Sequence, residues 1–122
     1  MKVYMNTDYR PAFQAKISQR FTNSLRGYVN NGPNRLKNNY ILTQKIEEYA
    51  KFGYDNYTIE MQQTSGRLGL EYRLFAVKDG DDTSKGIVLT KKTLTSYRKM
   101  YERFMNFNKH DFVNIMKSKL NK

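Results

Sequence analysis

Apolar residues recur at every fourth position near the start of the chain, and this spacing predicts a first helix. Side chains four residues apart lie on one face of an α-helix and can pack together against a core. Pro11 suits the first turn of such a helix, and Gly27 is expected to end it. The residues of the predicted apolar face are Phe13, Ile17, Phe21 and Leu25.

A second helix is predicted after residues 30–34, Asn-Asn-Gly-Pro-Asn, which form a strong turn signal. The register of its apolar face is clear only from about Tyr40, and residues 34–39 fit either the start of the helix or a loop. Gly53 is expected to cap its C-terminal end. The residues that share its face are Leu42, Ile46, Tyr49 and Ala50.

The period of the pattern then changes to two, which is typical of β-strands. Apolar and polar residues alternate through 57–61, and again through 68–77 after a predicted turn at 64–67. Residues 86–90 predict a third and shorter strand.

Helical spacing returns after the third strand and continues to the C-terminal end. A third helix is expected to start at Thr90 or Thr93, and a fourth follows an interruption at residues 108–111. The resulting order, α-α-β-β-β-α-α, predicts a single α+β domain over residues 1–122, in which a three-stranded antiparallel sheet is flanked by N-terminal and C-terminal helices. The predicted buried residues of the last two helices are Leu94, Tyr97, Tyr101, Phe104, Met105, Phe112, Ile115, Met116 and Leu120.

The composition adds a strong positive charge to this fold. The chain holds 22 Lys and Arg against 11 Asp and Glu, a net charge of +11, which favours polyanionic partners. It contains no Cys, which excludes a disulfide framework and thiol catalysis. No apolar run has the length of a membrane span, so we expect a cytoplasmic protein without a membrane partner. The abundance of Asn, Lys and Tyr suggests an AT-rich genome, such as that of a low-GC bacterium or its phages.

Residues 9–46 contain no Asp or Glu, and their cations repel one another. A negative partner stabilises such a segment, and we interpret it as a basic N-terminal helical segment that meets phosphates. The alternative is a solvated basic face on an ordinary domain. The candidate contact residues in this segment are Arg10, Lys16, Arg20, Arg26, Arg35 and Lys37.

Lys91 and Lys92 form a second candidate anion site. If a helix begins at Thr90, both lysines lie at the positive end of its dipole, and a bound phosphate relieves the conflict. The alternative is that Thr93 caps the helix and the lysines lie in a solvated loop.

Exposed aromatic rings are a further candidate, because they stack on unpaired bases. The tyrosines that lie near cations in the sequence are Tyr28, Tyr40, Tyr54 and Tyr57. Core packing is the alternative, and it is favoured for Tyr57 because the chain has no Trp to fill its core.

The pattern offers little for catalysis. His110 is the only histidine, which rules out a pair of histidine metal ligands. Asp55 and Glu71 are similar in their placement to acidic residues of a metal-dependent nuclease, and this is the enzymatic alternative. We otherwise expect no enzyme activity, no cofactor and no small-molecule substrate.

Two family resemblances extend these predictions. Three strands followed by Lys91 and Lys92, after a helix that carries Glu48 and Tyr49, resemble a double-stranded-RNA-binding domain over residues 42–104. This resemblance implies that the two lysines contact phosphates across the major groove. A small, Cys-free α+β chain rich in Lys, Asn and Tyr, with a basic N-terminal segment, is similar to phage-encoded anti-CRISPR inhibitors of type II RNA-guided nucleases. That resemblance implies a protein that occupies a nucleic-acid channel or grips the loaded complex.

The leading hypothesis is a non-enzymatic phage or mobile-element protein that binds a nucleic-acid-loaded host defence complex, as an anti-CRISPR-like inhibitor of an RNA-guided nuclease. The first alternative is a stand-alone double-stranded nucleic-acid-binding protein or repressor. The second is a metal-dependent nuclease.

Overall fold

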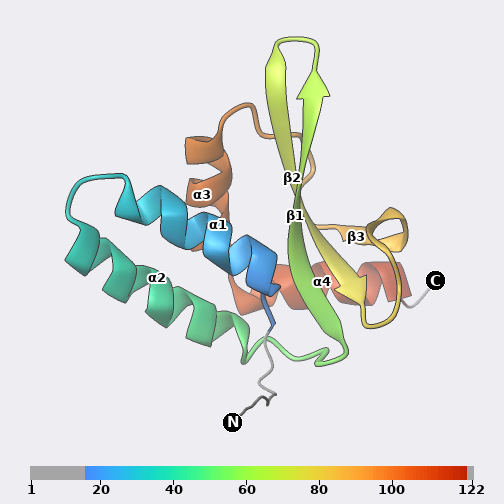
Figure 1. Cartoon of the computed structure of the whole chain (residues 1–122). Helices are drawn as coiled ribbons and strands as arrows, with labels where there is room; N and C mark the ends of the chain where they lie inside the picture. The colour runs from blue at the N-terminus through green and yellow to red at the C-terminus, as the bar shows by residue number, and fades with distance from the viewer. Residues whose placement is uncertain (1–15, 121–122) are drawn as a thin grey trace, which may run out of the picture.

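Helices and strands follow one another in the order α-α-β-β-β-α-α, which confirms the predicted α+β class (Figure 1). The computed structural model describes residues 16–120. Within this range no helix combines the length and the apolar character needed to cross a lipid bilayer. The elements are α1 (Gln19–Asn30), α2 (Arg35–Tyr49), β1 (Tyr57–Gly66), β2 (Gly69–Lys78), the short 3-10 helix η1 (Thr83–Lys85), β3 (Ile87–Val88), α3 (Tyr97–Asn106) and α4 (Lys109–Leu120).

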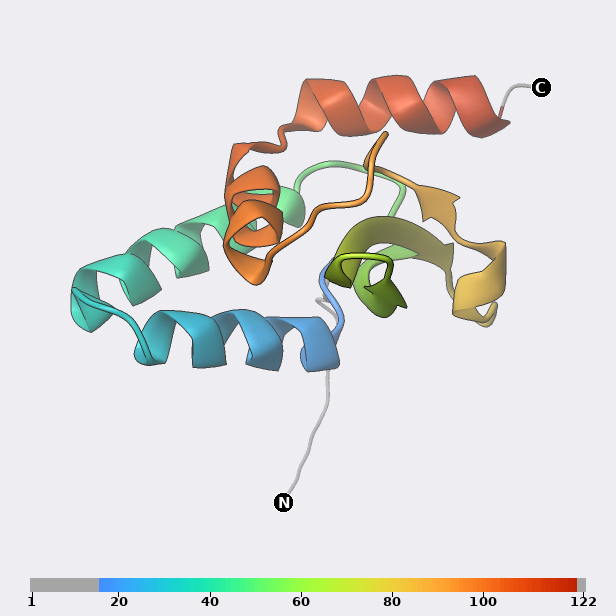
Figure 2. The ribbon, with the colours of Figure 1, turned by 90° about the horizontal axis from the view of Figure 1, so that it is seen from above.

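The helices enclose the sheet from two sides. Figure 2 shows α1 and α4 on opposite sides of the molecule, with α3 and the sheet between them. Most residues of the predicted apolar faces lie in the core or pack against it. Ala50 and Leu120 are exceptions, because both are exposed near the ends of their helices.

The first helix begins later than the apolar spacing predicts. Ser18 caps α1, and its Oγ accepts a hydrogen bond of 3.1 Å from the Phe21 amide. Just before this cap, Ile17 pairs with Ile59 of β1 in an isolated parallel bridge with backbone hydrogen bonds of 3.2 and 2.6 Å. The spacing at Ile17 therefore reflects burial against the sheet and not a helical turn. Pro11 and Phe13 lie outside the described residues.

Residues 34–39, which fit either a helix start or a loop in the sequence, are helical except for the first, because α2 begins at Arg35. Asn34 precedes the helix in the left-handed conformation (φ 56°), which Asn tolerates better than most residues. The helix ends at Tyr49, so the prediction that Gly53 caps it is wrong. Tight turns continue beyond the helix and bring Phe52 into the core before the chain reverses at Gly53 (φ 89°).

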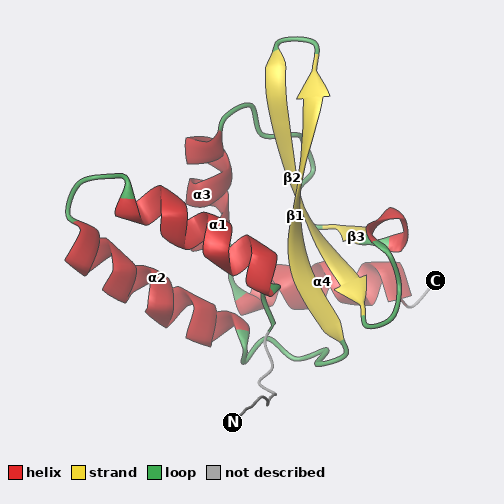
Figure 3. Ribbon diagram, in the orientation of Figure 1, coloured by secondary structure: helices red, strands yellow, loops and turns green. Residues whose placement is uncertain are grey.

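β1 and β2 form a long antiparallel hairpin, and β3 adds to the edge of β2 (Figure 3). The hairpin register runs from Tyr57 opposite Lys78 at the base to Gly66 opposite Gly69 near the tip. The first strand is therefore longer than predicted, and two residues form the turn that was expected over residues 64–67. β3 holds two residues and is shorter than predicted. The outer half of the hairpin projects beyond the helices in Figure 1.

The third helix begins several residues after the predicted start at Thr90 or Thr93. Upstream of it, Leu94 pairs with Tyr72 of β2 through two backbone hydrogen bonds of 2.8 and 2.9 Å. This pairing keeps the chain extended, so the helix cannot start before it. Ser96 then caps α3, and its Oγ accepts a hydrogen bond of 3.1 Å from the backbone amide three residues later.

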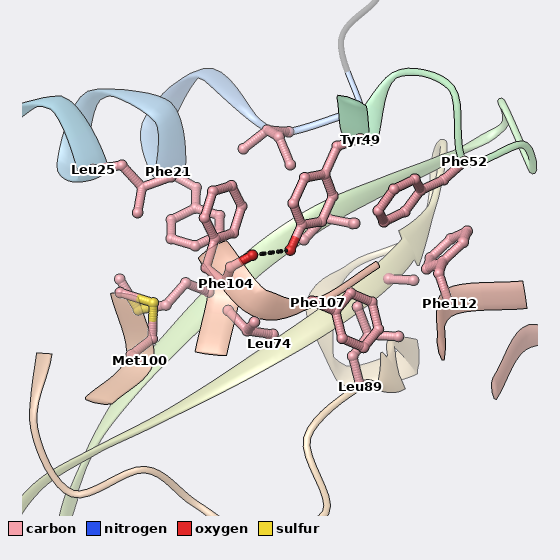
Figure 4. Packing of buried hydrophobic residues seen from close by; sticks show 14 of the residues in the cluster. Phe21, Leu25, Tyr49, Phe52, Leu74, Leu89, Met100, Phe104, Phe107 and Phe112 are labelled. Atoms are coloured by element: carbon pink, nitrogen blue, oxygen red, sulfur yellow. Dashed lines mark hydrogen bonds between the residues drawn. The ribbon is translucent and has the colours of Figure 1, made fainter. Parts of the chain in front are cut away.

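Aromatic rings from three parts of the chain meet in the core (Figure 4). The ring of Tyr49 stacks on Phe104 with a centroid distance of 4.5 Å and an interplanar angle of 6°. Tyr49 also stacks with Phe52, again with a centroid distance of 4.5 Å. Phe107 and Phe112, from the junction of α3 and α4, complete the cluster. Stacked rings supply the bulk that Trp provides in many other small domains.

Candidate anion-binding groove

Lys16, predicted to contact a polyanionic partner, is instead enclosed by the fold. Its side chain is buried, and its Nζ donates to two carbonyl oxygens of the loop between α2 and β1 and to one at the start of β1. Burial lowers the pKa of Lys16, while the charges of two nearby aspartates act in the opposite direction. The amine therefore holds the loop in place and is not available to a partner. The acceptors are Gly53 (2.7 Å), Tyr54 (2.6 Å) and Tyr57 (3.2 Å).

Arg20 and Arg26 also make contacts within the fold. Nη2 of Arg20 lies 3.0 Å from the Glu60 carboxylate and donates to the Met61 carbonyl oxygen at 2.8 Å. Nη1 of Arg26 donates to the carbonyl and side-chain oxygens of Asn39 at 3.3 and 3.2 Å. The first contact ties α1 to β1, and the second ties α1 to α2.

Arg35 and Lys37 are exposed on the first turn of α2, at the positive end of the helix dipole. Arg10 lies outside the described residues. Among the candidate contact residues of the segment 9–46 that the structure describes, Lys16 is buried and Arg26 is half-buried. Arg20, Arg35 and Lys37 are exposed, and Arg20 also pairs with Glu60.

Lys91 and Lys92 line a groove of about 920 Å³ formed by the loop between β3 and α3, by α3 and by α4. Arg103 of α3 and Lys119 of α4 raise the cations among the described lining residues to four. Among the described residues that line the groove, Asp111 is the one with a carboxylate. This excess of positive charge in a concave surface attracts anions.

The backbone of β2 holds both ends of the loop that carries the lysines. The Leu89 amide donates to the Leu74 carbonyl oxygen at 2.8 Å, and Leu94 pairs with Tyr72. On β2, a single residue lies between the two attachment points, Leu74 and Tyr72. On the loop, four residues lie between Leu89 and Leu94. The loop must therefore bulge away from the sheet, which exposes both lysines. The predicted helix start at the lysines is wrong, and the alternative of a loop position is confirmed.

Thr90 contributes a buried polar atom beside the two lysines. Its residue surface is 4% exposed, and within residues 16–120 its Oγ1 has no hydrogen-bond partner. Buried hydroxyl groups in proteins almost always have a partner. Thr90 is one of the residues that line the groove, and its Oγ1 itself lies beneath the surface. Leu89, Leu94 and Ile115 give the groove apolar surface beside its charges.

The four tyrosines considered for base stacking lie in different environments. Tyr54 and Tyr57 pack against the core, in agreement with the packing alternative favoured for Tyr57. Tyr28 packs against two tyrosines of α3, with centroid distances of 4.9 Å to each. Tyr40 is 64% exposed on α2, so of these four rings it has the most surface available for stacking.

The fold does not bring Asp55 and Glu71 together. Asp55 lies just before Tyr57 at the base of the hairpin, whereas Glu71 pairs with Thr64 in its outer half. Seven strand positions separate these two levels, which is roughly 23 Å. Between residues 16 and 120, no group of three or more His, Cys, Asp or Glu side chains is placed to hold a metal ion. His110 is exposed on α4.

Thr90, Arg103 and Lys119 are groove residues that the sequence did not identify as site residues. Thr90 belongs to the lysine loop itself, whereas Arg103 and Lys119 are brought beside it only when α3 and α4 pack against the sheet. The adjacent pair Lys91-Lys92 is the one local signal of this site in the sequence.

No family model, curated protein or solved structure matches this chain. The groove is therefore interpreted from its own geometry and charge.

Proposed function

We propose that this chain is a non-enzymatic protein that binds nucleic-acid phosphates through the groove beside Lys91 and Lys92. The observation that carries the proposal is the charge of the groove, where four cationic side chains and one carboxylate are found among the described lining residues. Lysine acts on phosphate as a point charge, and arginine bonds it through two parallel N–H groups. Each phosphate neutralised in this way releases counterions, which favours binding at low salt.

The other groove residues favour a nucleotide unit over a free phosphate. Leu94 and Ile115 line the groove and are partly exposed, so they offer apolar surface to a sugar or a base. The volume of about 920 Å³ lies within the range of pockets that enclose ligands of this size.

The specific form of the proposal is an anti-CRISPR-like inhibitor from a phage or a mobile element. Its target would be a type II RNA-guided nuclease that carries its guide RNA. Such nucleases hold nucleic acid in a positively charged channel. A compact chain with a net charge of +11 can compete for that nucleic acid or bind its exposed segments.

A stand-alone binder of double-stranded nucleic acid is the second candidate. The projecting β1–β2 hairpin favours it, because a two-stranded ribbon can enter a nucleic-acid groove without help from another protein (Figure 1).

The test compares two charge-reversal variants of equal net charge. Lys91→Glu/Lys92→Glu alters the groove, whereas Lys109→Glu/Lys117→Glu alters exposed lysines of α4 that do not line it. Each protein is titrated against single-stranded RNA, duplex DNA and a guide-loaded type II nuclease over a range of salt concentrations. We expect the groove variant to lose about tenfold or more in affinity and the control to lose much less.

The same titrations separate the candidate functions. Tight binding to the loaded nuclease with weak binding to naked nucleic acid supports the inhibitor, and loss of target cleavage by that nuclease supports it further. Equal affinity for naked duplex supports the stand-alone binder. Equal behaviour of the two variants on every probe would show that the groove is not the binding site. Degradation of the nucleic acid that stops with a chelator and with Glu71→Ala would favour the nuclease instead.

A further inference from the structure

We propose that the outer half of the β1–β2 hairpin, residues 62–73, inserts into the major groove of duplex DNA. This inference rests on the proposed function, and it names duplex DNA as the partner. The hairpin projects beyond the helices, so its outer half can be reached from outside (Figure 1). At its root, Met61 and Tyr72 are buried, and Arg20 bonds the Met61 carbonyl oxygen. The projecting arm therefore leaves the body from a fixed base.

One face of this arm carries polar side chains along its length. The register places Gln62 opposite Arg73 and Thr64 opposite Glu71. Cross-strand partners share one face of a sheet, and these four positions alternate with those that face the core. Gln62, Thr64 and Arg73 are exposed, and Glu71 is half-buried. The face turned away from the core is therefore open and rich in hydrogen-bonding groups.

A glycine near the tip gives Glu71 its place on this face. A Cβ atom on Gly66 would overlap the Glu71 carboxyl group. Gly66 lies opposite Gly69, so no side chain from either strand covers the carboxylate at that level. The polar face therefore keeps an acceptor beside its donors.

These side chains match the chemistry of base edges in the major groove. Arginine bonds O6 and N7 of guanine, glutamine bonds N6 and N7 of adenine, and glutamate accepts from N4 of cytosine. Arg73, Gln62 and Glu71 supply these groups from one face. At the tip, Leu68 is 94% exposed and offers apolar contact to a thymine methyl group, while Arg67 beside it can bond a phosphate.

The shape of the arm selects DNA over RNA. A two-stranded ribbon fits the major groove of B-form DNA, which is about 12 Å wide. The major groove of A-form RNA is deep and narrow, and side chains cannot read it. The arm should therefore discriminate between the two duplexes, although the basic groove alone would bind both.

The experiment measures binding of the full chain by fluorescence anisotropy. The probes are a duplex DNA selected from a random-sequence pool, its separate strands, and the duplex RNA of the same sequence. Arg73→Ala is compared with Lys78→Ala, which removes a charge from the same strand outside the arm. Gln62→Ala is compared with Gln63→Ala, which removes the same side chain from the opposite face.

We expect Arg73→Ala to lower affinity for the selected duplex about tenfold, with a smaller loss for Gln62→Ala. The two control variants should change it about twofold or less. Affinity for single strands should stay unchanged in all four. Methylation of guanine N7 in the duplex should weaken the wild-type chain, because it blocks an acceptor in the major groove.

Equal losses from Arg73→Ala and Lys78→Ala, together with equal losses from Gln62→Ala and Gln63→Ala, overturn the hairpin proposal. Equal wild-type affinity for duplex RNA and duplex DNA overturns it as well. In both cases the proposed function stands if Lys91→Glu/Lys92→Glu still lowers affinity about tenfold or more. If the wild-type chain binds neither these nucleic acids nor a loaded nuclease, both proposals fail.

Discussion

The Tyr49 hydroxyl donates a hydrogen bond of 2.7 Å to the Phe104 carbonyl oxygen, while the two rings lie nearly parallel. One pair of residues thus joins the end of α2 to α3 in the interior by both stacking and a hydrogen bond (Figure 4). The hydroxyl group is satisfied without reaching solvent, so the ring can be fully buried.

Tyr49→Phe should lower the free energy of unfolding by about 1 kcal/mol or more, because the Phe104 carbonyl oxygen loses its buried donor. Urea denaturation followed by circular dichroism measures the change. Tyr40→Phe is the matched control, since Tyr40 is 64% exposed and its hydroxyl bonds only Gln44 among the described residues. Equal effects of the two variants would contradict a structural role for the buried hydroxyl.

The stability of the protein should fall as the pH rises above about 10. Burial raises the pKa of Tyr49 well above its usual value, so the folded state keeps a proton that the unfolded state loses. When the pKa of a group is higher in the folded state than in the unfolded state, the resulting stabilisation is complete below the pKa of the unfolded state. It is lost as the pH rises from there toward the pKa of the folded state. Burial also raises the pKa values of Tyr97 and Tyr101, which adds to the same slope.

Comparison of the wild type with Tyr49→Phe isolates the contribution of Tyr49 to this pH dependence. The lowered pKa of Lys16 acts in the opposite direction, because between its folded and unfolded pKa values the unfolded chain binds more protons. Lys16 is present in both proteins and cancels in the difference. The variant should lose stability less steeply in alkaline urea titrations, and parallel curves would count against this assignment.

Lys16→Met should destabilise the fold by about 2 kcal/mol or more, because carbonyl oxygens of the loop after α2 lose their donor. Lys37→Met, at an exposed position of α2, should leave stability nearly unchanged. At a temperature where both variants are folded, Lys16→Met should bind nucleic acid with the same affinity as the wild type. If Lys16→Met is as stable as the wild type but binds nucleic acid more weakly, Lys16 is a contact residue after all.

Ser96→Ala should lower stability by about 1 kcal/mol, because α3 loses its N-cap hydrogen bond. Thr93→Ala is the control, since Thr93 precedes the helix and does not cap it. Thermal or urea unfolding measures both variants. A larger effect at Thr93 would place the start of the helix where the sequence alone predicts it.

Lys91→Ala/Lys92→Ala should reduce the slope of log affinity against log salt concentration by about 2 if each lysine contacts one phosphate. Lys109→Ala/Lys117→Ala removes the same charge from α4 outside the groove and should change the slope much less. Titrations of duplex DNA at several salt concentrations give both slopes. If the two double variants have identical slopes, Lys91 and Lys92 do not contact phosphates.

The order of the elements could be predicted from the sequence because each element repeats its apolar residues with its own period. The boundaries depended on contacts with distant residues. Ile17 continues the four-residue spacing of Phe21 and Leu25, yet Ile59 pairs with its backbone and keeps it extended. Leu94 fits a helical face equally well, and its pairing with Tyr72 delays the helix.

The candidate site was only partly visible for a related reason. Charge can be counted along a sequence, but whether a cation is free depends on its neighbours in the folded chain. Lys16 is buried and bonds carbonyl groups some 40 positions away, whereas Arg20 pairs with Glu60 and stays exposed. Arg103 and Lys119 join the lysine loop only through the packing of two helices.

The lysine loop contains more chain than its closure requires. Its anchors, Leu89 and Leu94, face strand positions about 7 Å apart, whereas five peptide steps can reach about 17 Å. Insertions or deletions of a residue between them therefore leave both attachments to β2 intact. Loop length, and with it the reach of its positive charge, can vary at this point with little disturbance to the rest of the architecture.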